Sequence, residues 1–192
     1  MIPILFIRHG RTSWNADKKL QGRRDIPLSD EGRLLLKTLA LPIEFSNYSW
    51  VSSPLSRAVE TAKMLGADDL TIEDQLIEMD WGEWEGQRVK DLQRRLGAKM
   101  AKIESQGLHM KPPGGESPAN VQHRLLPWIA RVKEPTIAVT HKGVIRAIKS
   151  LAYNWDMTDK SSVPFDWNCA HLFKINAQGL PVADRVNISL ET

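Results

Sequence analysis

The sequence is poor in cysteine, has no long hydrophobic run and carries no strong excess of charge. Cys169 is the single cysteine among 192 residues. It excludes an intramolecular disulfide and favours a reducing compartment. Because its neighbours Trp167, Leu172 and Phe173 are apolar, we expect Cys169 to be a buried small hydrophobe rather than a nucleophile.

No apolar run approaches the length of about 18 residues that a membrane span needs. The apolar segment 1–7 is short, has no basic residues before it and leads into Arg8 and His9, so it predicts a buried strand and not a signal peptide. Lysine and arginine number 26 against 23 aspartate and glutamate, and no segment concentrates the excess. A broad surface for nucleic acid is therefore not expected. These absences predict a soluble cytoplasmic protein with no nucleic-acid or membrane partner.

The strongest local cluster of positive charge lies near the N-terminus. It consists of Arg8, Arg11, Lys18, Lys19, Arg23 and Arg24. A cluster of this size fits a site for a small anion as well as it fits a solvated surface patch.

Segments typical of strands alternate with segments typical of helices along the chain. Strands are predicted over 2–7, 48–53, 136–140, 168–175 and 181–188, an extended segment over 70–85, and helices over 30–41, 54–65, 89–106, 121–132 and 142–153. This alternation predicts βαβ units and a mostly parallel sheet. No repeat or linker divides the chain, so we expect one domain over residues 1–192.

Each of three predicted strands leads into a helix through a turn that carries a positive or ionisable residue. The first turn holds Arg8 and His9, the second is followed by Arg57, and the third holds His141. In parallel sheets ligands bind beyond the carboxyl ends of the strands, so these residues are expected at one rim. Two guanidinium groups and two imidazoles suit a compact dianion such as phosphate.

Histidine is a competent nucleophile at phosphorus because its neutral form is well populated near neutral pH. Attack by histidine would give a phosphohistidine intermediate, and the leaving alkoxide would then need a proton from a carboxylic acid. Several acids lie in one stretch: Glu73, Asp74, Glu78, Asp80, Glu83 and Glu85. Spacing alone does not choose among them.

Six motifs, in this order along the chain, resemble those of the histidine phosphatase superfamily. They are R-H-G-R-T-S-W-N (8–15), Q-G-R-R-D-I-P-L (21–28), S-S-P-L-S-R-A-V-E-T-A (52–62), E-M-D-W-G-E-W-E-G (78–86), P-G-G-E-S (113–117) and T-H-K-G-V-I-R (140–146). The resemblance implies the phosphoglycerate mutase-like fold. That fold is an α/β three-layer sandwich with a mostly parallel central sheet flanked by helices.

The resemblance implies that His9 is the nucleophile that becomes phosphorylated and that Glu78 gives a proton to the leaving oxygen. It implies a catalytic part for Arg8, Arg57 and His141, which neutralise the phosphoryl oxygens. Residues expected to bind the phosphate group or the substrate are Arg8, Asn15, Gln21, Gly22, Arg57 and His141. No metal and no other cofactor is implied.

Arg11 departs from the family pattern, which commonly has Glu or Gln at this position. We hypothesise that Arg11, together with Arg23 or Arg24, contacts a second anionic group on the substrate. The alternative is that Arg11 points to solvent and pairs with an acid.

The resemblance leaves three functions open. A phosphatase passes the phosphoryl group to water, a phosphoglycerate mutase returns it to a hydroxyl, and a non-catalytic relative only binds phosphate. The mutases resembled here are longer, with an insertion over the site, whereas residues 86–117 of this chain are short. We therefore expect a phosphatase for a small phosphorylated metabolite, similar to α-ribazole phosphatase-like proteins. The two C-terminal strands could pair across a homodimer.

Overall fold

The computed structural model describes residues 1–190 and is built on one six-stranded sheet with the order β3-β2-β4-β1-β5-β6. In chain order the elements are β1 (Ile2–Arg8), α1 (Ser13–Ala16), α2 (Asp30–Leu36), η1 (Ile43–Phe45), β2 (Ser49–Ser52), α3 (Ser56–Met64), β3 (Leu70–Ile72), η2 (Asp74–Leu76), η3 (Gly82–Trp84), α4 (Val89–Leu96), α5 (Ala98–Glu104), η4 (Gly107–His109), α6 (Pro118–Arg131), β4 (Thr136–Thr140), α7 (Lys142–Tyr153), β5 (Ala170–Ile175) and β6 (Pro181–Ile188), where η marks a 3-10 helix. Strands β3, β2, β4 and β1 are parallel, and β5 and β6 extend the sheet in antiparallel pairing. The predicted α/β class with a mostly parallel sheet is confirmed.

Strand β1 is buried on both faces and divides the hydrophobic core into two parts. Ile4 and Phe6 pack into the cluster formed with α6 and α7, and Leu5 and Ile7 pack into the cluster formed with α3. Successive side chains of a strand point to opposite faces, so a continuous apolar run serves both layers. The predicted three-layer sandwich follows from this arrangement.

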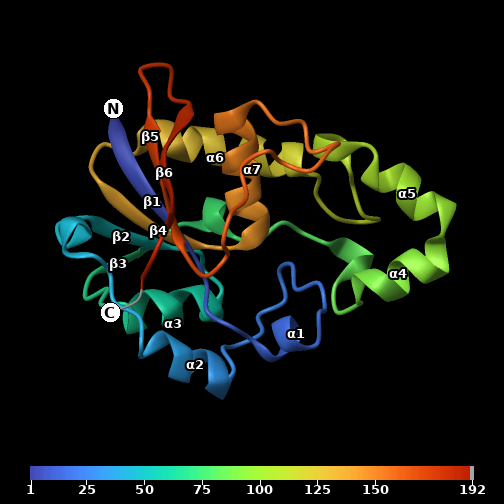
Figure 1. Cartoon of the computed structure of the whole chain (residues 1–192), viewed down its shortest axis with the longest axis horizontal. Coiled ribbons are helices and arrows are strands. Elements are labelled where there is room, and N and C mark those ends of the chain that lie inside the picture. The colour runs from blue at the N-terminus through green and yellow to red at the C-terminus, as the bar shows by residue number, and fades with distance from the viewer. Residues whose placement is uncertain (191–192) are drawn as a thin grey trace.

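Figure 1 shows α2 and α3 on one side of the sheet and α6 and α7 on the other. Helices α4 and α5 form an arm beside the sheet, and Gly97, with φ of +49°, makes the turn between them. The helix expected over 89–106 is thus two helices, α4 and α5. Within residues 1–190, no helix combines the length and the apolar character needed to cross a bilayer.

Two predicted elements are shorter than expected. The helix over 30–41 ends at Leu36, and the Thr38 hydroxyl donates to the Leu35 carbonyl in the turn that follows. The segment 70–85 is extended only over Leu70–Ile72, and 3-10 helices and turns make up the rest. Strand β2 ends at Ser52, which pairs with Ile72, so no neighbouring strand continues the ladder.

Cys169 is half-buried instead of buried, and it lines a cavity next to β1. It lies just before β5, where the chain enters the sheet. The expectation of a buried small hydrophobe is therefore wrong for this residue. Residues 191–192 of the predicted domain lie outside the described part of the chain.

Candidate active site

The carboxyl ends of β1, β2 and β4 meet at one rim of the sheet. The His9 N–H donates to the Thr140 carbonyl at 2.9 Å, and the Ser53 N–H donates to the Val139 carbonyl at 3.0 Å. These bonds continue the parallel ladders by one residue and bring the turns after the three strands together. The prediction that His9 and His141 share one rim is confirmed, since their ring centroids are 5.1 Å apart.

His9 is held in the state that a nucleophile needs. Its Nδ1 lies 2.7 Å from the Gly10 carbonyl oxygen, which can only accept a hydrogen bond. Nδ1 therefore carries the proton, and Nε2 is left with a free lone pair. Burial, reinforced by the charges of Arg57 and Arg8, holds the pKa of His9 well below its usual value. The ring is therefore neutral at physiological pH.

His141 lies fully buried behind His9. Its Nε2 is 2.7 Å from the Ser53 hydroxyl, and its Nδ1 has no hydrogen-bond partner within residues 1–190. Burial and the neighbouring His9 hold the pKa of His141 well below its usual value. Ser53 was not singled out as a site residue from the sequence, although it belongs to the S-S-P-L-S-R motif. It orients His141 from the end of β2.

Arg57 is fully buried in the first turn of α3. Its two terminal nitrogens donate to the Gly22 carbonyl at 2.8 Å and to the Arg24 carbonyl at 2.9 Å. Its Nε has no hydrogen-bond partner within residues 1–190. The guanidinium therefore ties the loop of the second motif to the start of α3, and its charge acts on His9 and His141.

Gly22 supports this loop and lies on the wall of neither described cavity, contrary to the expected contact with phosphate. Its φ is +56°, and a side chain on Gly22 would place a Cβ 1.8 Å from Oε1 of Glu85. That carboxylate accepts the Arg23 N–H at 2.6 Å and the Arg24 N–H at 3.2 Å. The Q-G motif thus shapes the loop from which Arg57 takes its two carbonyl partners.

A cavity of about 510 Å³ brings His9 together with four of the other predicted residues. Arg8, Asn15, Gln21 and Glu78 also line it. The Asn15 side-chain oxygen accepts the Thr12 N–H at 3.0 Å, which caps α1 and leaves the amide nitrogen as a donor. Arg57 and His141 lie buried behind this wall instead of lining it.

A second cavity, of about 690 Å³, lies on the other side of Arg8 and His9. It is lined by Arg11, Glu31 and Cys169 among others, whereas Glu78 lies in the smaller cavity only. A nucleophile and a proton donor must face the same substrate. The smaller cavity is therefore the candidate active site.

Glu78 differs from the other acids of its stretch in burial and in position. Its two carboxyl oxygens accept the Met79 N–H at 2.8 Å and the Gly143 N–H at 3.2 Å. A Cβ at Gly143 would lie 2.3 Å from Oε1 of Glu78, so glycine is required for this approach. Burial outweighs these two bonds and raises the pKa of Glu78, so its carboxyl keeps a proton to higher pH than usual.

The neighbouring acids serve other purposes. One oxygen of Asp80 accepts the Gly82 N–H at 2.7 Å, and the other lies 3.7 Å from the Arg23 guanidinium. Glu83 is exposed. Glu78 is thus the acid of this stretch that faces His9 across the cavity.

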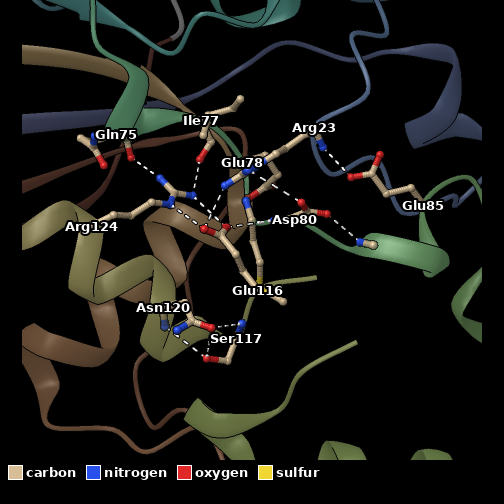
Figure 2. A network of polar contacts seen from close by, with 12 residues as sticks. Arg23, Gln75, Ile77, Glu78, Asp80, Glu85, Glu116, Ser117, Asn120 and Arg124 are labelled. Carbon is tan, nitrogen blue, oxygen red and sulfur yellow. Dashed lines mark hydrogen bonds and ion pairs between the residues drawn. The ribbon is translucent and has the colours of Figure 1, made fainter. Parts of the chain in front are cut away.

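Figure 2 shows a polar network that holds the chain on both sides of Glu78. Arg124 of α6 donates to the carbonyls of Gln75 and Ile77, the latter at 2.6 Å. Glu116 receives Arg124 Nε at 3.2 Å and the Asp80 N–H at 3.1 Å. Glu116 belongs to the P-G-G-E-S motif, but no role was predicted for it. Arg124 was not predicted as a site residue at all. An arginine two turns into a helix gives no local signal of its partners.

Replacing Arg124 by methionine is expected to lower the free energy of unfolding by about 2–4 kcal/mol, because buried carbonyls and Glu116 lose their donor. Where the variant is folded, kcat for alkyl phosphates is expected to fall more than kcat for p-nitrophenyl phosphate, since Glu78 is misplaced. Thermal unfolding and steady-state kinetics measure the two effects. Arg131→Met, an exposed change on the same helix, is the control; equal kcat losses for both substrates would contradict a role in placing Glu78.

The N-terminal basic cluster does not form one anion site. Arg11 pairs with Glu31 at 3.1 Å, Arg23 pairs with Glu116 at 2.9 Å, and Lys19 pairs with Asp17 at 2.9 Å. The exposed Arg11–Glu31 pair agrees with the second alternative for Arg11, in which it points to solvent and pairs with an acid. Of the cluster, Arg8 has a buried Nε for which residues 1–190 offer no hydrogen-bond partner.

The match to the histidine phosphatase superfamily (branch 1) covers residues 4–188, so the chain belongs to this family. Among its relatives, phosphoserine phosphatase 1 of Hydrogenobacter thermophilus is 28% identical over 77% of this chain and 74% of its own length. Glucosyl-3-phosphoglycerate phosphatase of Mycolicibacterium vanbaalenii is 31% identical over 76% of this chain and 71% of its own. A 2,3-bisphosphoglycerate-dependent phosphoglycerate mutase of Rhizobium etli is 25% identical over 100% and 99%.

The fold is that of the same family. The structure of phosphoserine phosphatase from Entamoeba histolytica in complex with 3-phosphoglyceric acid superposes with a TM-score of 0.82 at 23% identity, covering 98% of both chains. The Rhizobium etli mutase aligns over nearly its whole length. That alignment runs over 212 positions, more than the 192 residues of this chain, which agrees with the expectation that the mutases are longer.

Proposed function

We propose that this protein is a phosphomonoester hydrolase that acts on a small phosphorylated metabolite through a phosphohistidine on His9. One observation carries the proposal: a neutral histidine with a free Nε2 shares a cavity with a buried carboxyl whose pKa is raised. The lowered pKa of His9 favours the neutral nucleophile, and the raised pKa of Glu78 favours the protonated acid. Two-step phosphoryl transfer requires both. The relatives named as phosphatases support it.

In the first step, His9 Nε2 attacks phosphorus and the bond between phosphorus and the ester oxygen breaks. The leaving oxygen takes the proton of Glu78, so the alcohol departs neutral and Glu78 becomes a carboxylate. The charge of the phosphoryl oxygens is neutralised by Arg8 and Arg57, and hydrogen-bond donors such as Asn15 orient them. In this proposal the positive charges of Arg8 and Arg57 stabilise the phosphoryl group during transfer, and no metal is used.

In the second step, the Glu78 carboxylate takes a proton from a water molecule as its oxygen attacks phosphorus. The bond between phosphorus and Nε2 breaks, and inorganic phosphate and free His9 result. The same carboxyl thus gives and recovers one proton in each cycle. His141, neutral and buried behind His9, does not line the cavity, and in this proposal it supports the His9 ring between the two steps.

The mutase remains the second candidate, because one relative named as a mutase aligns along the whole chain. The two reactions share the first step and differ in the acceptor of the phosphoryl group. Binding without turnover is the third candidate, and the complete set of His9, Arg57, Glu78 and His141 speaks for turnover instead.

Product analysis with 3-phosphoglycerate tests the proposal. A phosphatase releases inorganic phosphate and glycerate, and no 2-phosphoglycerate accumulates. Formation of 2-phosphoglycerate without net phosphate release would establish the mutase instead. Binding of the substrate without either product would leave only the phosphate-binding role.

The natural substrate, a cytoplasmic location and a homodimer through β6 stay predictions. Candidate substrates include the phosphoserine and the glucosyl-3-phosphoglycerate named for two relatives, and an α-ribazole phosphate. The cytoplasmic location rests on the single cysteine, and the dimer rests on the place of β6 at the sheet edge.

A further inference from the structure

Helix α7 presents a row of cations along one face. Lys142, Arg146 and Lys149 are spaced four and three residues apart, which places them on one side of a helix. Lys149 is buried and donates to the Val163 carbonyl. Lys142 and Arg146 line the cavity that holds His9 and Glu78.

Within residues 1–190, the side chains of Lys142 and Arg146 make no hydrogen bond and no ion pair, although their backbone is part of α7. Arginines elsewhere near the site are paired: Arg11 with Glu31 and Arg23 with Glu116. Two unpaired cations beside Arg8 repel one another. Lys142 is exposed as a residue, but partial desolvation of its ammonium together with the charges of Arg8 and Arg146 lowers its pKa. Burial lowers the pKa of Arg146.

Aromatic rings hold both cations in place. Lys142 Nζ lies 4.9 Å from the centroid of the Trp167 ring, and the Arg146 guanidinium lies 5.3 Å from the centroid of the Trp155 ring. Such contacts stabilise a cation without neutralising its charge. The free protein therefore maintains two oriented positive charges that have no anion of their own.

The acids of the cavity do not supply the missing charge. Glu78 is the proton donor of the proposed reaction, its two oxygens accept the Met79 and Gly143 N–H groups instead of pairing with a cation, and burial raises its pKa. Glu104, from the arm formed by α4 and α5, also lines the cavity and accepts a hydrogen bond from the Gln93 side chain at 3.3 Å. Both cations are therefore available to an anion of the ligand.

We propose that Lys142 and Arg146 form a subsite for a second anionic group of the substrate, a carboxylate or a further phosphate. This inference rests on the proposed function and names the class of substrate: a small phosphomonoester with two anionic ends. A cavity of about 510 Å³ has room for a phosphoryl group at His9, a short organic body and a second anion at α7. Contact with a second anionic group was first suggested for Arg11. We assign it instead to Lys142 and Arg146 of α7, which line the same cavity as Glu78.

Matched substrates test the subsite. 3-Phosphoglycerate and glycerol 3-phosphate differ only in a carboxylate, and fructose 1,6-bisphosphate and fructose 6-phosphate differ only in a phosphate. In the pair whose second anion fits the subsite, Lys142→Gln and Arg146→Gln are each expected to lower kcat/KM about tenfold for the ester with two anionic groups. For the ester whose phosphate is its only anionic group, the loss is expected to be less than about twofold. The pair that shows this selective loss identifies the anion.

Arg11→Gln is the control, since it removes an equal charge from an exposed ion pair in the other cavity. It is expected to affect both members of each pair equally. Equal losses in Lys142→Gln or Arg146→Gln for both members would overturn the subsite, because the cations would then act only as a general attraction for phosphate. Lys142 is exposed at the start of α7, so its variant is expected to fold even if the Arg146 variant does not.

The same variants separate this inference from the proposed function. If the wild-type protein hydrolyses none of these esters nor p-nitrophenyl phosphate, the proposed function fails. Calorimetric binding of the same four compounds then still tests the subsite. Tighter binding of a doubly anionic member, lost in Arg146→Gln, supports it, and equal binding of both members overturns it.

Discussion

Replacing His9 by alanine is expected to abolish phosphate release from p-nitrophenyl phosphate, with a fall in kcat of about ten-thousand-fold or more. The imidazole Nε2 is the atom that takes the phosphoryl group, and its free lone pair is secured by the bond from Nδ1 to the Gly10 carbonyl. Without it, the cations of the site can bind phosphate but cannot form the intermediate. The measurement is a continuous assay of p-nitrophenolate release.

The control for this variant is His123→Ala, which removes an exposed histidine on α6. It is expected to retain wild-type activity and stability. Rapid quenching of the wild-type protein with a labelled substrate should trap an acid-labile, alkali-stable phosphoprotein, and His9→Ala should trap none. Trapped label in the His9 variant, or turnover within tenfold of the wild type, would assign the nucleophile elsewhere.

Replacing Glu78 by glutamine is expected to lower kcat for alkyl phosphates by about 10²–10⁴-fold, the usual contribution of a positioned general acid. The loss should be much smaller for p-nitrophenyl phosphate, because p-nitrophenolate leaves without a proton. Glutamine retains the size of the side chain and one acceptor oxygen, so besides the proton it loses only one of the two bonds from the Met79 and Gly143 N–H groups. Steady-state kinetics on a series of leaving groups measures the difference.

The pH dependence of the same variant gives an independent test. The raised pKa of Glu78 means that the acid form persists to higher pH than usual and is lost as the pH rises further. The wild-type protein should therefore lose activity toward alkyl phosphates on the alkaline side, and Glu78→Gln should lack this decline. The lowered pKa of His9 keeps the nucleophile neutral below pH 6.5, so the acid limb lies below that value.

Glu83→Gln serves as the control, because Glu83 is an exposed acid five residues away in the same stretch. We expect it to keep both the leaving-group dependence and the alkaline decline of the wild type. If Glu83→Gln lost activity toward alkyl phosphates and Glu78→Gln did not, the proton donor would be misassigned.

Much of the site could be predicted because its parts are local in the sequence. A buried strand followed at once by a polar turn and a helix places Arg8, His9 and His141 at the carboxyl end of a parallel sheet. Helix caps are local too: the side chains of Ser29 and Ser117 accept the N–H groups three residues further on, at the starts of α2 and α6. Arg57 follows the second strand in the same way, the motif order added Glu78, and Glu78 lines the same cavity as His9.

Contacts between distant segments could not be predicted. The bond from the Arg57 guanidinium to the Gly22 carbonyl and the bond from Arg124 to the Ile77 carbonyl join residues with no sequence relation. The extended segment over 70–85 was expected only from the alternation of residue types. A strand also needs a neighbouring strand to pair with, and β2 pairs with β3 only as far as Ser52. Propensity carries no information on where the partner strand ends.

The sequence by itself determined the family, the order of strands and helices, and the residues that could carry phosphoryl transfer, because short-range patterns encode turns, caps and motif spacing. Only the tertiary structure decided which charges are available to a ligand. Arg11 and Arg23 find acids far along the chain and are neutralised, whereas Lys142 and Arg146 find none in the described residues and face the cavity. The availability of a charge depends on what folding brings within a few ångströms of it.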